Sequence, residues 1–239
     1  MRLKAVFFDA GETLVYRNPS LASITSAMLK KSGYRIPRAA VEKAIGDAAR
    51  QMRGAVKKGK LSDSQKWAVY MKRIFSLLHV SDAALLETIK ARLKSGSSFR
   101  PYADALRTIK YLNGKGVVTG IISNAPRELI PILERAGMAK LVRHVVISEA
   151  AGVEKPNRRI FDLAVKKAGT GRDGFLYVGD NYLADIHGAL GAGLSAAWLL
   201  RRSTTGHFSY RHGKPDESVP VLKDLDELKE LIESEKWIK

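Results

Sequence analysis

Residues 4–14 read KAVFFDAGETL, a short apolar run that ends abruptly in an acid and a glycine. A run of this length between Lys4 and Asp9 is typical of a strand that is buried on both faces of a parallel sheet. Four later runs have the same character, at residues 117–122, 144–147, 175–178 and 195–200. The five runs predict the strands of one open sheet.

Amphipathic patterns lie between the later runs, as parallel strands require, because each crossover is usually a helix. Apolar residues recur at helical spacing in residues 103–112, 128–136, 159–168 and 225–232. Strands that alternate with helices predict an α/β fold with a doubly wound parallel sheet. We therefore expect a Rossmann-like core.

Residues 17–98 differ from this pattern because they contain no convincing strand. Four amphipathic helices are expected there, at residues 20–31, 38–57, 62–79 and 81–94. Asn18-Pro19 and the stretch SGSS at residues 95–98 are typical of linkers at the two ends of an insertion. The predicted domains are a Rossmann-like core made of residues 1–15 and 99–239, and an inserted all-helical domain made of residues 16–98.

Composition excludes several classes of protein. The chain of 239 residues is 45% hydrophobic, which is sufficient for a core of this size. Zero cysteines exclude a disulfide scaffold, an Fe–S cluster, a thiolate zinc site and a cysteine nucleophile. No apolar run approaches the roughly 18 residues of a membrane span, and the first residues do not resemble a signal peptide. We expect a cytoplasmic protein that does not associate with membranes.

The net charge of +17 is concentrated in the helical insertion. From Tyr16 to Arg100 the sequence holds 18 Lys and Arg residues against five Asp and Glu residues. A basic surface suits anionic partners such as nucleic acid or phosphorylated metabolites. For any single lysine, a solvated helical face is an equally good explanation.

Polar residues stand just after the predicted strands, at the edge of a parallel sheet where ligands bind. Because this edge collects the ends of all the strands, we expect these side chains to lie close together. They are Asp9 after the first strand, Ser123 and Asn124 after the second, Lys155 before the helix that follows the third, and Asp180 and Asp185 after the fourth.

Three carboxylates at one edge would repel one another, by about 4 kcal/mol for a pair ~4 Å apart. A cation among Asp9, Asp180 and Asp185 would remove this repulsion. Hard oxygen ligands without histidine or cysteine favour Mg²⁺. Lys155 adds a fixed positive charge, and the Ser123 hydroxyl is able to donate a hydrogen bond to a phosphoryl oxygen. The sequence therefore predicts a magnesium site that holds an oxyanion.

The order of these motifs resembles the haloacid dehalogenase-like hydrolase superfamily. A strand that ends in Asp9, a strand that ends in Ser123-Asn124, then Lys155-Pro156, and then Gly179-Asp180 with Asp185 follow one another as in that family. Each motif alone is weak, but all four in order are specific. The resemblance covers nearly the whole chain, and the helical insertion stands where the family has its cap domain.

The resemblance implies a Mg²⁺-dependent phosphatase that acts on a small phosphorylated metabolite. Asp9 would be the nucleophile that forms an aspartyl-phosphate, and it would also bind the metal. The other implied roles are metal binding by the Gly11 carbonyl, Asp180 and Asp185, and substrate binding by Ser123, Asn124 and Lys155.

The chain departs from the family's phosphatases at Gly11. In those enzymes the residue two after the nucleophile is a second Asp, which protonates the leaving group and later activates water. Such a general acid is worth about 10²–10⁴ in rate. Glu12 is one residue out of register, and we interpret it as a solvent-facing turn residue. Three explanations stay open: Glu12 serves as the acid, a residue of the helical domain serves, or the leaving group needs no proton.

The departure also opens three other functions. 2-Haloacid dehalogenases of the family also lack this acid, but their active site is metal-free and has a Ser-type residue where Asp180 stands. Phosphonate hydrolases keep the metal but need a cap lysine that forms a Schiff base, and nothing selects one among Lys30, Lys31, Lys43, Lys57 and Lys58. The third is a non-catalytic polyanion-binding protein. Because the acidic positions and Lys155 are intact and no nucleic-acid motif is present, we expect a small anionic phosphorylated substrate rather than nucleic acid.

Overall fold

The computed structural model describes residues 2–56, 63–94, 99–201 and 216–237. The chain forms two compact units. One is built from the residues up to Tyr16 and from Phe99 onward, and the other lies within residues 17–98. We refer to them as the core unit and the helical unit. Several predictions lie outside the described residues. They are the helix end at residue 57, the helix start at residue 62, the linker at residues 95–98, and Lys57 and Lys58.

The core unit contains a six-stranded sheet in the order β5-β4-β1-β6-β7-β8. Every pair of neighbours in it is parallel. The strands are β1 (Ala5–Phe8), β4 (Val118–Ser123), β5 (His144–Ile147), β6 (Phe175–Gly179), β7 (Ser195–Leu199) and β8 (Val221–Leu222). The five predicted strands are confirmed within one residue at each end. The prediction missed β8, which has only two residues at the edge of the sheet.

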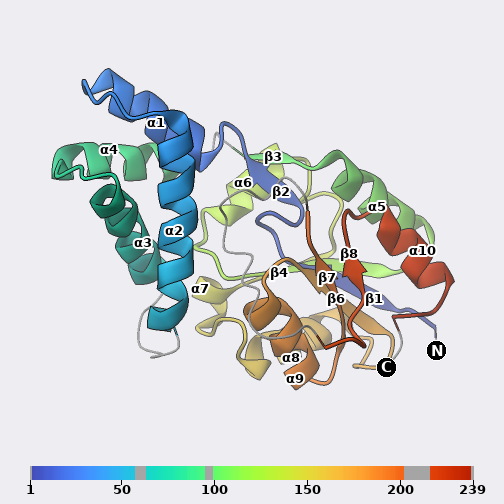
Figure 1. Ribbon diagram of the computed structural model, residues 1–239. Coiled ribbons are helices and arrows are strands. Elements are labelled where there is room, and N and C mark those ends of the chain that lie inside the picture. The colour runs from blue at the N-terminus through green and yellow to red at the C-terminus, as the bar shows by residue number, and fades with distance from the viewer. Residues whose placement is uncertain (1, 57–62, 95–98, 202–215, 238–239) are drawn as a thin grey trace. The chain divides into compact units, whose positions relative to one another are not determined.

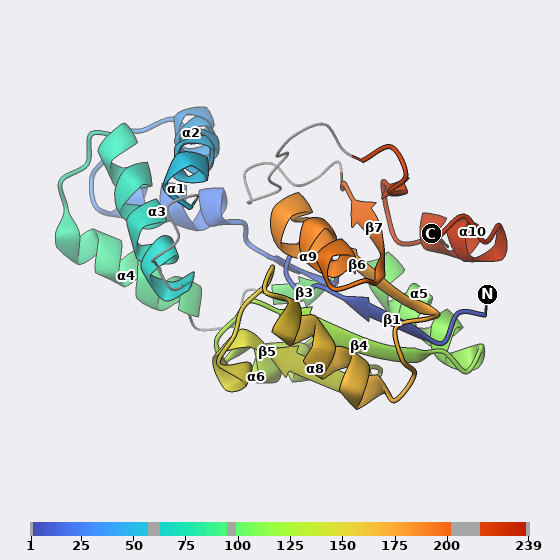
Figure 2. The same ribbon diagram turned by 90° about the horizontal axis from the view of Figure 1, so that it is seen from below.

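Helices cover both faces of the sheet (Figure 2). α5 (Ala103–Gly114), α6 (Leu129–Arg135) and α10 (Glu227–Glu233) pack on one face, and α8 (Arg158–Ala168), the π-helix η1 (Tyr182–His187) and α9 (Gly188–Gly191) pack on the other. Within β1, Val6 and Phe8 join the first cluster and Ala5 and Phe7 join the second. Because side chains alternate along a strand, all four residues of this apolar run are fully buried. The α/β doubly wound core is therefore confirmed.

Two short strands form a separate two-stranded sheet. β2 (Val15–Arg17) and β3 (Phe99–Pro101) lie at the two points where the chain leaves and re-enters the core unit. The Tyr16 and Tyr102 rings pack with their centroids 4.7 Å apart. Each strand has three residues, which is too short for a period-two pattern to reveal it.

The helical unit consists of α1 (Leu21–Lys31), α2 (Arg38–Val56), α3 (Asp63–Leu77) and α4 (Ala83–Lys94), drawn in blue to green in Figure 1. Ser20 caps α1, because its side chain accepts a hydrogen bond from the Ser23 N–H. The helices bury an apolar cluster of their own, which includes Leu29, Val41, Tyr70 and Ile74. None of the helices that the structure describes is both long and apolar enough to cross a membrane.

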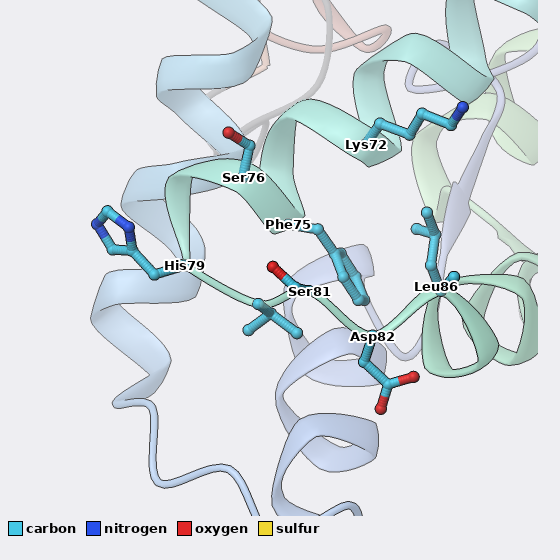
Figure 3. A pocket seen from close by; sticks show the side chains of 9 residues that line it. Lys72, Phe75, Ser76, His79, Ser81, Asp82 and Leu86 are labelled. Carbon is cyan, nitrogen blue, oxygen red and sulfur yellow. The ribbon is translucent and has the colours of Figure 1, made fainter.

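An open groove of about 570 Å³ lies in the helical unit between the end of α3 and the start of α4 (Figure 3). Asp82 at its rim caps α4, since its carboxylate accepts a hydrogen bond of 2.8 Å from the Leu85 N–H. The groove is lined by the apolar Phe75, Val80 and Leu86 and by the polar Lys72, Ser76, His79, Ser81 and Asp82. The groove contains none of the residues that the sequence predicted for a site.

Candidate active site

Two acids stand where neighbouring strands end. Asp9 follows β1 directly, and its N–H donates to the Val178 carbonyl at 2.9 Å, which continues the pairing of β1 with β6 by one residue. Asp180 follows β6, and its carbonyl accepts a hydrogen bond of 2.9 Å from the Trp198 indole. Because β1 and β6 are adjacent, the sheet itself brings the two carboxylates together.

The third acid, Asp185, comes from η1 and turns back onto the end of β6. Its Oδ2 accepts a hydrogen bond of 2.9 Å from the Asn181 N–H. Gly179 makes this approach sterically feasible, because a Cβ at that position would overlap the Asp185 carboxylate. A π-helical turn at such a place is typical of functional sites.

The Lys155 ammonium lies among these acids. Its Nζ is 2.6 Å from both Asp9 Oδ1 and Asp185 Oδ1. It also donates to the Tyr177 hydroxyl at 2.9 Å and to the Ile122 carbonyl at 3.0 Å. The Lys155 side chain is 2% exposed and that of Asp185 is 1% exposed, whereas that of Asp9 is 13% exposed. Asp9 is thus the most open member of the cluster.

Two residues at the end of β4 complete this edge. The Asn124 amide donates to the Lys155 carbonyl at 2.9 Å, and its Oδ1 accepts from the Lys155 N–H at 2.7 Å. Asn124 therefore fixes the backbone of Lys155, and substrate binding by its side chain stays a prediction. Ser123 is the last residue of β4 and is buried next to Ile122, whose carbonyl contacts Lys155.

The acidic trio is compact enough to hold a metal ion. Asp9, Asp180 and Asp185 each offer a carboxylate oxygen, and these oxygens all lie within 4.8 Å of one another. Three carboxylates face one ammonium, which leaves the cluster short of positive charge. An all-oxygen donor set with this deficit fits Mg²⁺. Gly11 is close in sequence, and a Cβ added there would meet nothing within 4 Å.

The titration of these groups reflects burial and crowding. Burial raises the pKa of Asp9 to about 6, against the opposing effect of Lys155. Burial, together with the charges of Asp9 and Asp185, raises the pKa of Asp180 well above its usual value. For Lys155, burial alone would lower the pKa, but Asp185 and Asp9 outweigh it and raise the pKa. The cluster therefore favours a bound proton or another cation.

The environment of Glu12 differs from the solvent-facing turn that the sequence predicted. Glu12 is half-buried rather than solvent-facing, and its Oε2 accepts a hydrogen bond of 3.0 Å from the Tyr102 hydroxyl. Its backbone has a φ of 57°, which is unusual for a residue other than glycine. No local pattern indicates this contact, because Tyr102 is 90 residues away along the chain.

Sequence reasoning also missed Tyr177, which it assigned to the apolar interior of a strand. Its hydroxyl donates to the Ile122 carbonyl at 3.0 Å and lies 3.2 Å from Asp185 Oδ1. Burial and the neighbouring carboxylates raise its pKa well above the usual value, so the phenol stays protonated. A tyrosine in a fully buried strand needs a hydrogen-bond partner for its hydroxyl. This requirement is the feature of the sequence by which Tyr177 could have been found.

The family model described as haloacid dehalogenase-like hydrolase matches residues 3–193. The chain belongs to this family. Among its curated relatives, the haloacid dehalogenase-like hydrolase domain-containing protein 3 of Danio rerio is 27% identical over 93% of both chains. The glyceraldehyde 3-phosphate phosphatase of Methanothermobacter thermautotrophicus is 28% identical over 96% of this chain and 100% of its own.

Solved structures of haloacid dehalogenase-like hydrolases share the fold. YfnB from Bacillus subtilis matches 98% of this chain and 100% of its own with a TM-score of 0.75 and 20% identity. The L-2-haloacid dehalogenase RSc1362 matches the same shares with a TM-score of 0.72 and 19% identity. Because a structure named only as a hydrolase of the family and one named as a dehalogenase match almost equally well, the fold does not select the reaction.

Proposed function

We propose that this hydrolase is a Mg²⁺-dependent phosphatase that acts on a small phosphorylated metabolite through an aspartyl-phosphate at Asp9. The observation that carries the proposal is the cluster of three carboxylates within 4.8 Å of one another around one buried ammonium. Relatives named glyceraldehyde 3-phosphate phosphatase and phosphoglycolate phosphatase 1 support it, at 28% and 26% identity over 96% of this chain.

Asp9 would act as the nucleophile. It is the most open carboxylate of the cluster, and with a pKa of about 6 it is mostly ionised at neutral pH. A carboxylate oxygen of Asp9 would attack phosphorus while the bond from phosphorus to the ester oxygen breaks. Water would then hydrolyse the acyl phosphate, which releases inorganic phosphate and restores Asp9.

Lys155 and Ser123 would hold the transferring group. The Lys155 ammonium already contacts Asp9 at 2.6 Å, so a phosphoryl group on Asp9 would lie beside a fixed positive charge. Two fixed partners, Asp185 and Tyr177, keep the ammonium from moving. The Ser123 hydroxyl at the end of β4 would donate to a phosphoryl oxygen.

Asp9, Asp180 and Asp185, with the Gly11 carbonyl, would hold the Mg²⁺ ion. When bound, the ion supplies positive charge that neutralises the phosphoryl oxygens. Gly179 keeps the Asp185 carboxylate in this trio by leaving room for it.

Gly11 leaves the source of the proton for the leaving group open. Glu12 is tied to Tyr102, the helical unit offers other groups, and a good leaving group needs no proton. We propose that the helical unit serves as the cap that selects the substrate, and that its basic residues attract anionic substrates. A cytoplasmic location stays a prediction from the sequence.

Asp180 and Asp185 favour phosphoryl transfer over dehalogenation. The family's dehalogenases have a metal-free site, which lacks an acid where Asp180 stands. Among the described lysines of the helical unit, Lys90 pairs with Glu87 and Lys43 pairs with Asp47. No observation marks any one of them for Schiff-base chemistry, so phosphonate hydrolysis has no specific support.

The test is release of p-nitrophenol from p-nitrophenyl phosphate by the full-length protein, with Mg²⁺ and then with excess chelator. This substrate has a good leaving group, so the missing acid at Gly11 would not hide activity. We expect turnover that is lost with chelator and in Asp9→Asn. Turnover that survives either change would contradict the proposal, and so would its absence in a folded, Mg²⁺-binding protein.

A further inference from the structure

A second buried ion pair lies in the core unit and shares no residue with the Lys155 cluster. Arg201 follows β7, and Asp104 stands in the first turn of α5. The guanidinium donates to both Asp104 oxygens, at 2.7 and 3.1 Å, and the two side chains are 7% and 9% exposed. None of the roles proposed above uses this pair. Because desolvation offsets the attraction, a buried ion pair alone is weak evidence for stability.

The pair and its neighbour Tyr102 hold three successive residues of the turn that follows the nucleophile. Arg201 Nη2 donates to the Thr13 carbonyl at 2.9 Å. Tyr102 donates from its N–H to the Leu14 carbonyl at 2.9 Å and from its hydroxyl to Glu12 Oε2 at 3.0 Å. The Arg201 guanidinium carbon also lies 3.8 Å from the centre of the Tyr102 ring, so the Arg201 and Tyr102 side chains stabilise each other.

Asp104 fixes this arrangement to the rest of the core unit. Its Oδ2 accepts a hydrogen bond of 2.8 Å from the Leu225 N–H, and its Oδ1 accepts one of 2.8 Å from the Ala105 N–H. Each oxygen thus has a backbone donor in addition to the guanidinium. Such a carboxylate has one orientation, and it fixes the orientation of Arg201.

The turn needs such support because its backbone is strained. Glu12 has a φ of 57°, a conformation that persists in non-glycine residues when the surroundings hold it. Its N–H donates to the Val15 carbonyl at 2.8 Å, which closes the turn. The same turn carries Gly11, whose carbonyl is a proposed metal ligand, and begins at Asp9.

We propose that Arg201 is a positioning residue for the reaction at Asp9. Arg201, Asp104 and Tyr102 form a clamp that holds residues 12–14 in one conformation, and this conformation orients Asp9 and Gly11 for the reaction. The kinetic consequence rests on the proposed function, but the structural consequence does not. A misplacement of about 1 Å at such a site can cost 10²-fold in rate, so the clamp acts on catalysis through geometry alone.

The first test compares Arg201→Lys with Thr108→Val. Arg201→Lys keeps the positive charge but loses the two-pronged contact, and we expect kcat on p-nitrophenyl phosphate to fall about tenfold or more with KM within about twofold. Thr108 is the matched control, because its buried hydroxyl donates to the carbonyl of the same Leu225 at 2.9 Å rather than to the turn. Thr108→Val should lower Tm and leave kcat unchanged.

Two milder variants test the clamp if Arg201→Lys fails to fold. Tyr102→Phe removes only the hydroxyl that holds Glu12, and it keeps the ring and the N–H. Tyr111→Phe removes a similar hydroxyl, which donates to Glu233 of α10 at 2.9 Å in a solvent-exposed contact. We expect a lower kcat in the first variant only. Equal kcat in Tyr102→Phe, Tyr111→Phe and the unmodified protein would overturn the role of Tyr102.

Amide hydrogen exchange tests the clamp without any activity. The peptide that spans residues 9–16 should exchange faster in Arg201→Lys than in the unmodified protein, and Thr108→Val should leave it unchanged. Faster exchange in a protein that has no phosphatase activity would support the clamp and contradict the proposed function. Unchanged exchange would overturn the clamp whatever the activity.

A rescue experiment separates positioning from general stability. Glycine adopts positive φ without strain, so Glu12→Gly should hold the turn without the clamp. We expect Glu12→Gly to restore most of the kcat that Arg201→Lys loses. A double variant that stays as slow as Arg201→Lys would show that the turn is not what Arg201 holds.

Discussion

Two buried cations, Lys155 and Arg201, hold carboxylates inside the core unit, but with different charge balance. Lys155 lies among three acids, of which Asp9 is partly open to solvent. Arg201 pairs with Asp104, whose oxygens also have backbone donors. The excess of negative charge around Lys155 makes that cluster a place for a further cation. The matched pair at Arg201 makes a support instead.

Removal of Arg201 is expected to have the largest effect on stability. Arg201→Met leaves the Asp104 carboxylate buried without its cation, which should destabilise the protein by about 3–5 kcal/mol. At roughly 2–4 °C per kcal/mol, thermal unfolding would show the loss directly. The double variant Arg201→Met with Asp104→Leu should recover part of it, because no charge is then stranded. If the double variant unfolds as early as the single one, the ion pair is not the support.

Removing Lys155 should instead damage function. Lys155→Met takes away the fixed positive charge beside Asp9, and we expect kcat to fall about 10²–10³-fold. Lys110→Met on the exposed side of α5 is the matched control and should retain full activity. Steady-state kinetics in saturating Mg²⁺ provide the measurement. Near-normal kcat in Lys155→Met would show that the ammonium does not take part.

The charge imbalance around Lys155 also predicts a dependence of stability on pH. The pKa of Asp9 is raised from 3.8 to about 6 in the folded protein, so the fold binds an extra proton between these values. In chelator, stability should therefore fall as pH rises from 4 to 6, by about 3 kcal/mol from Asp9 alone. Because Mg²⁺ binds the ionised carboxylates, it should raise Tm more at pH 8 than at pH 5. A Mg²⁺ effect that is equal at both values would contradict this.

Adding a fourth acid to the Lys155 cluster tests the role of Gly11. A Cβ is accommodated at this position, because it meets nothing within 4 Å. Gly11→Asp should raise kcat about tenfold or more for alkyl phosphates, whose leaving groups need a proton, and change p-nitrophenyl phosphate turnover little. Gly11→Asn has the same shape without the proton and is the control. A gain shared by both variants would point to shape rather than proton transfer.

The smallest effect is expected from exposed cations, which water screens. If the helical unit attracts anionic substrates, kcat/KM should fall several-fold between low and high ionic strength. Lys30→Gln with Lys31→Gln, both exposed at the end of α1, should reduce this dependence. The same changes at Lys110 and Lys140 of the core unit should not. A kcat/KM that does not respond to salt would end the steering hypothesis.

The sequence predicted the sheet and the acidic edge because both are local properties. The run at β1 alternates between two buried faces. Asp9 and Asp180 each directly follow a strand, and Lys155 stands in the short turn before α8. The clamp was invisible because Arg201 is 97 residues from Asp104 and 188 residues from Thr13 along the chain, and no motif links these positions. Arg201 directly follows the strand predicted at residues 195–200, and nothing in the local pattern indicates that it is buried. Local patterns reveal elements, whereas long-range polar pairs emerge only from packing.

The pairing of β2 with β3 has a consequence for modularity. The two strands bring the ends of an insertion of some eighty residues side by side, with Tyr16 packed against Tyr102. A segment whose ends adjoin can be exchanged for another, or for a short turn, without moving the strands that carry Asp9 and Ser123. The edge proposed for catalysis and the helical unit are thus free to diverge at different rates.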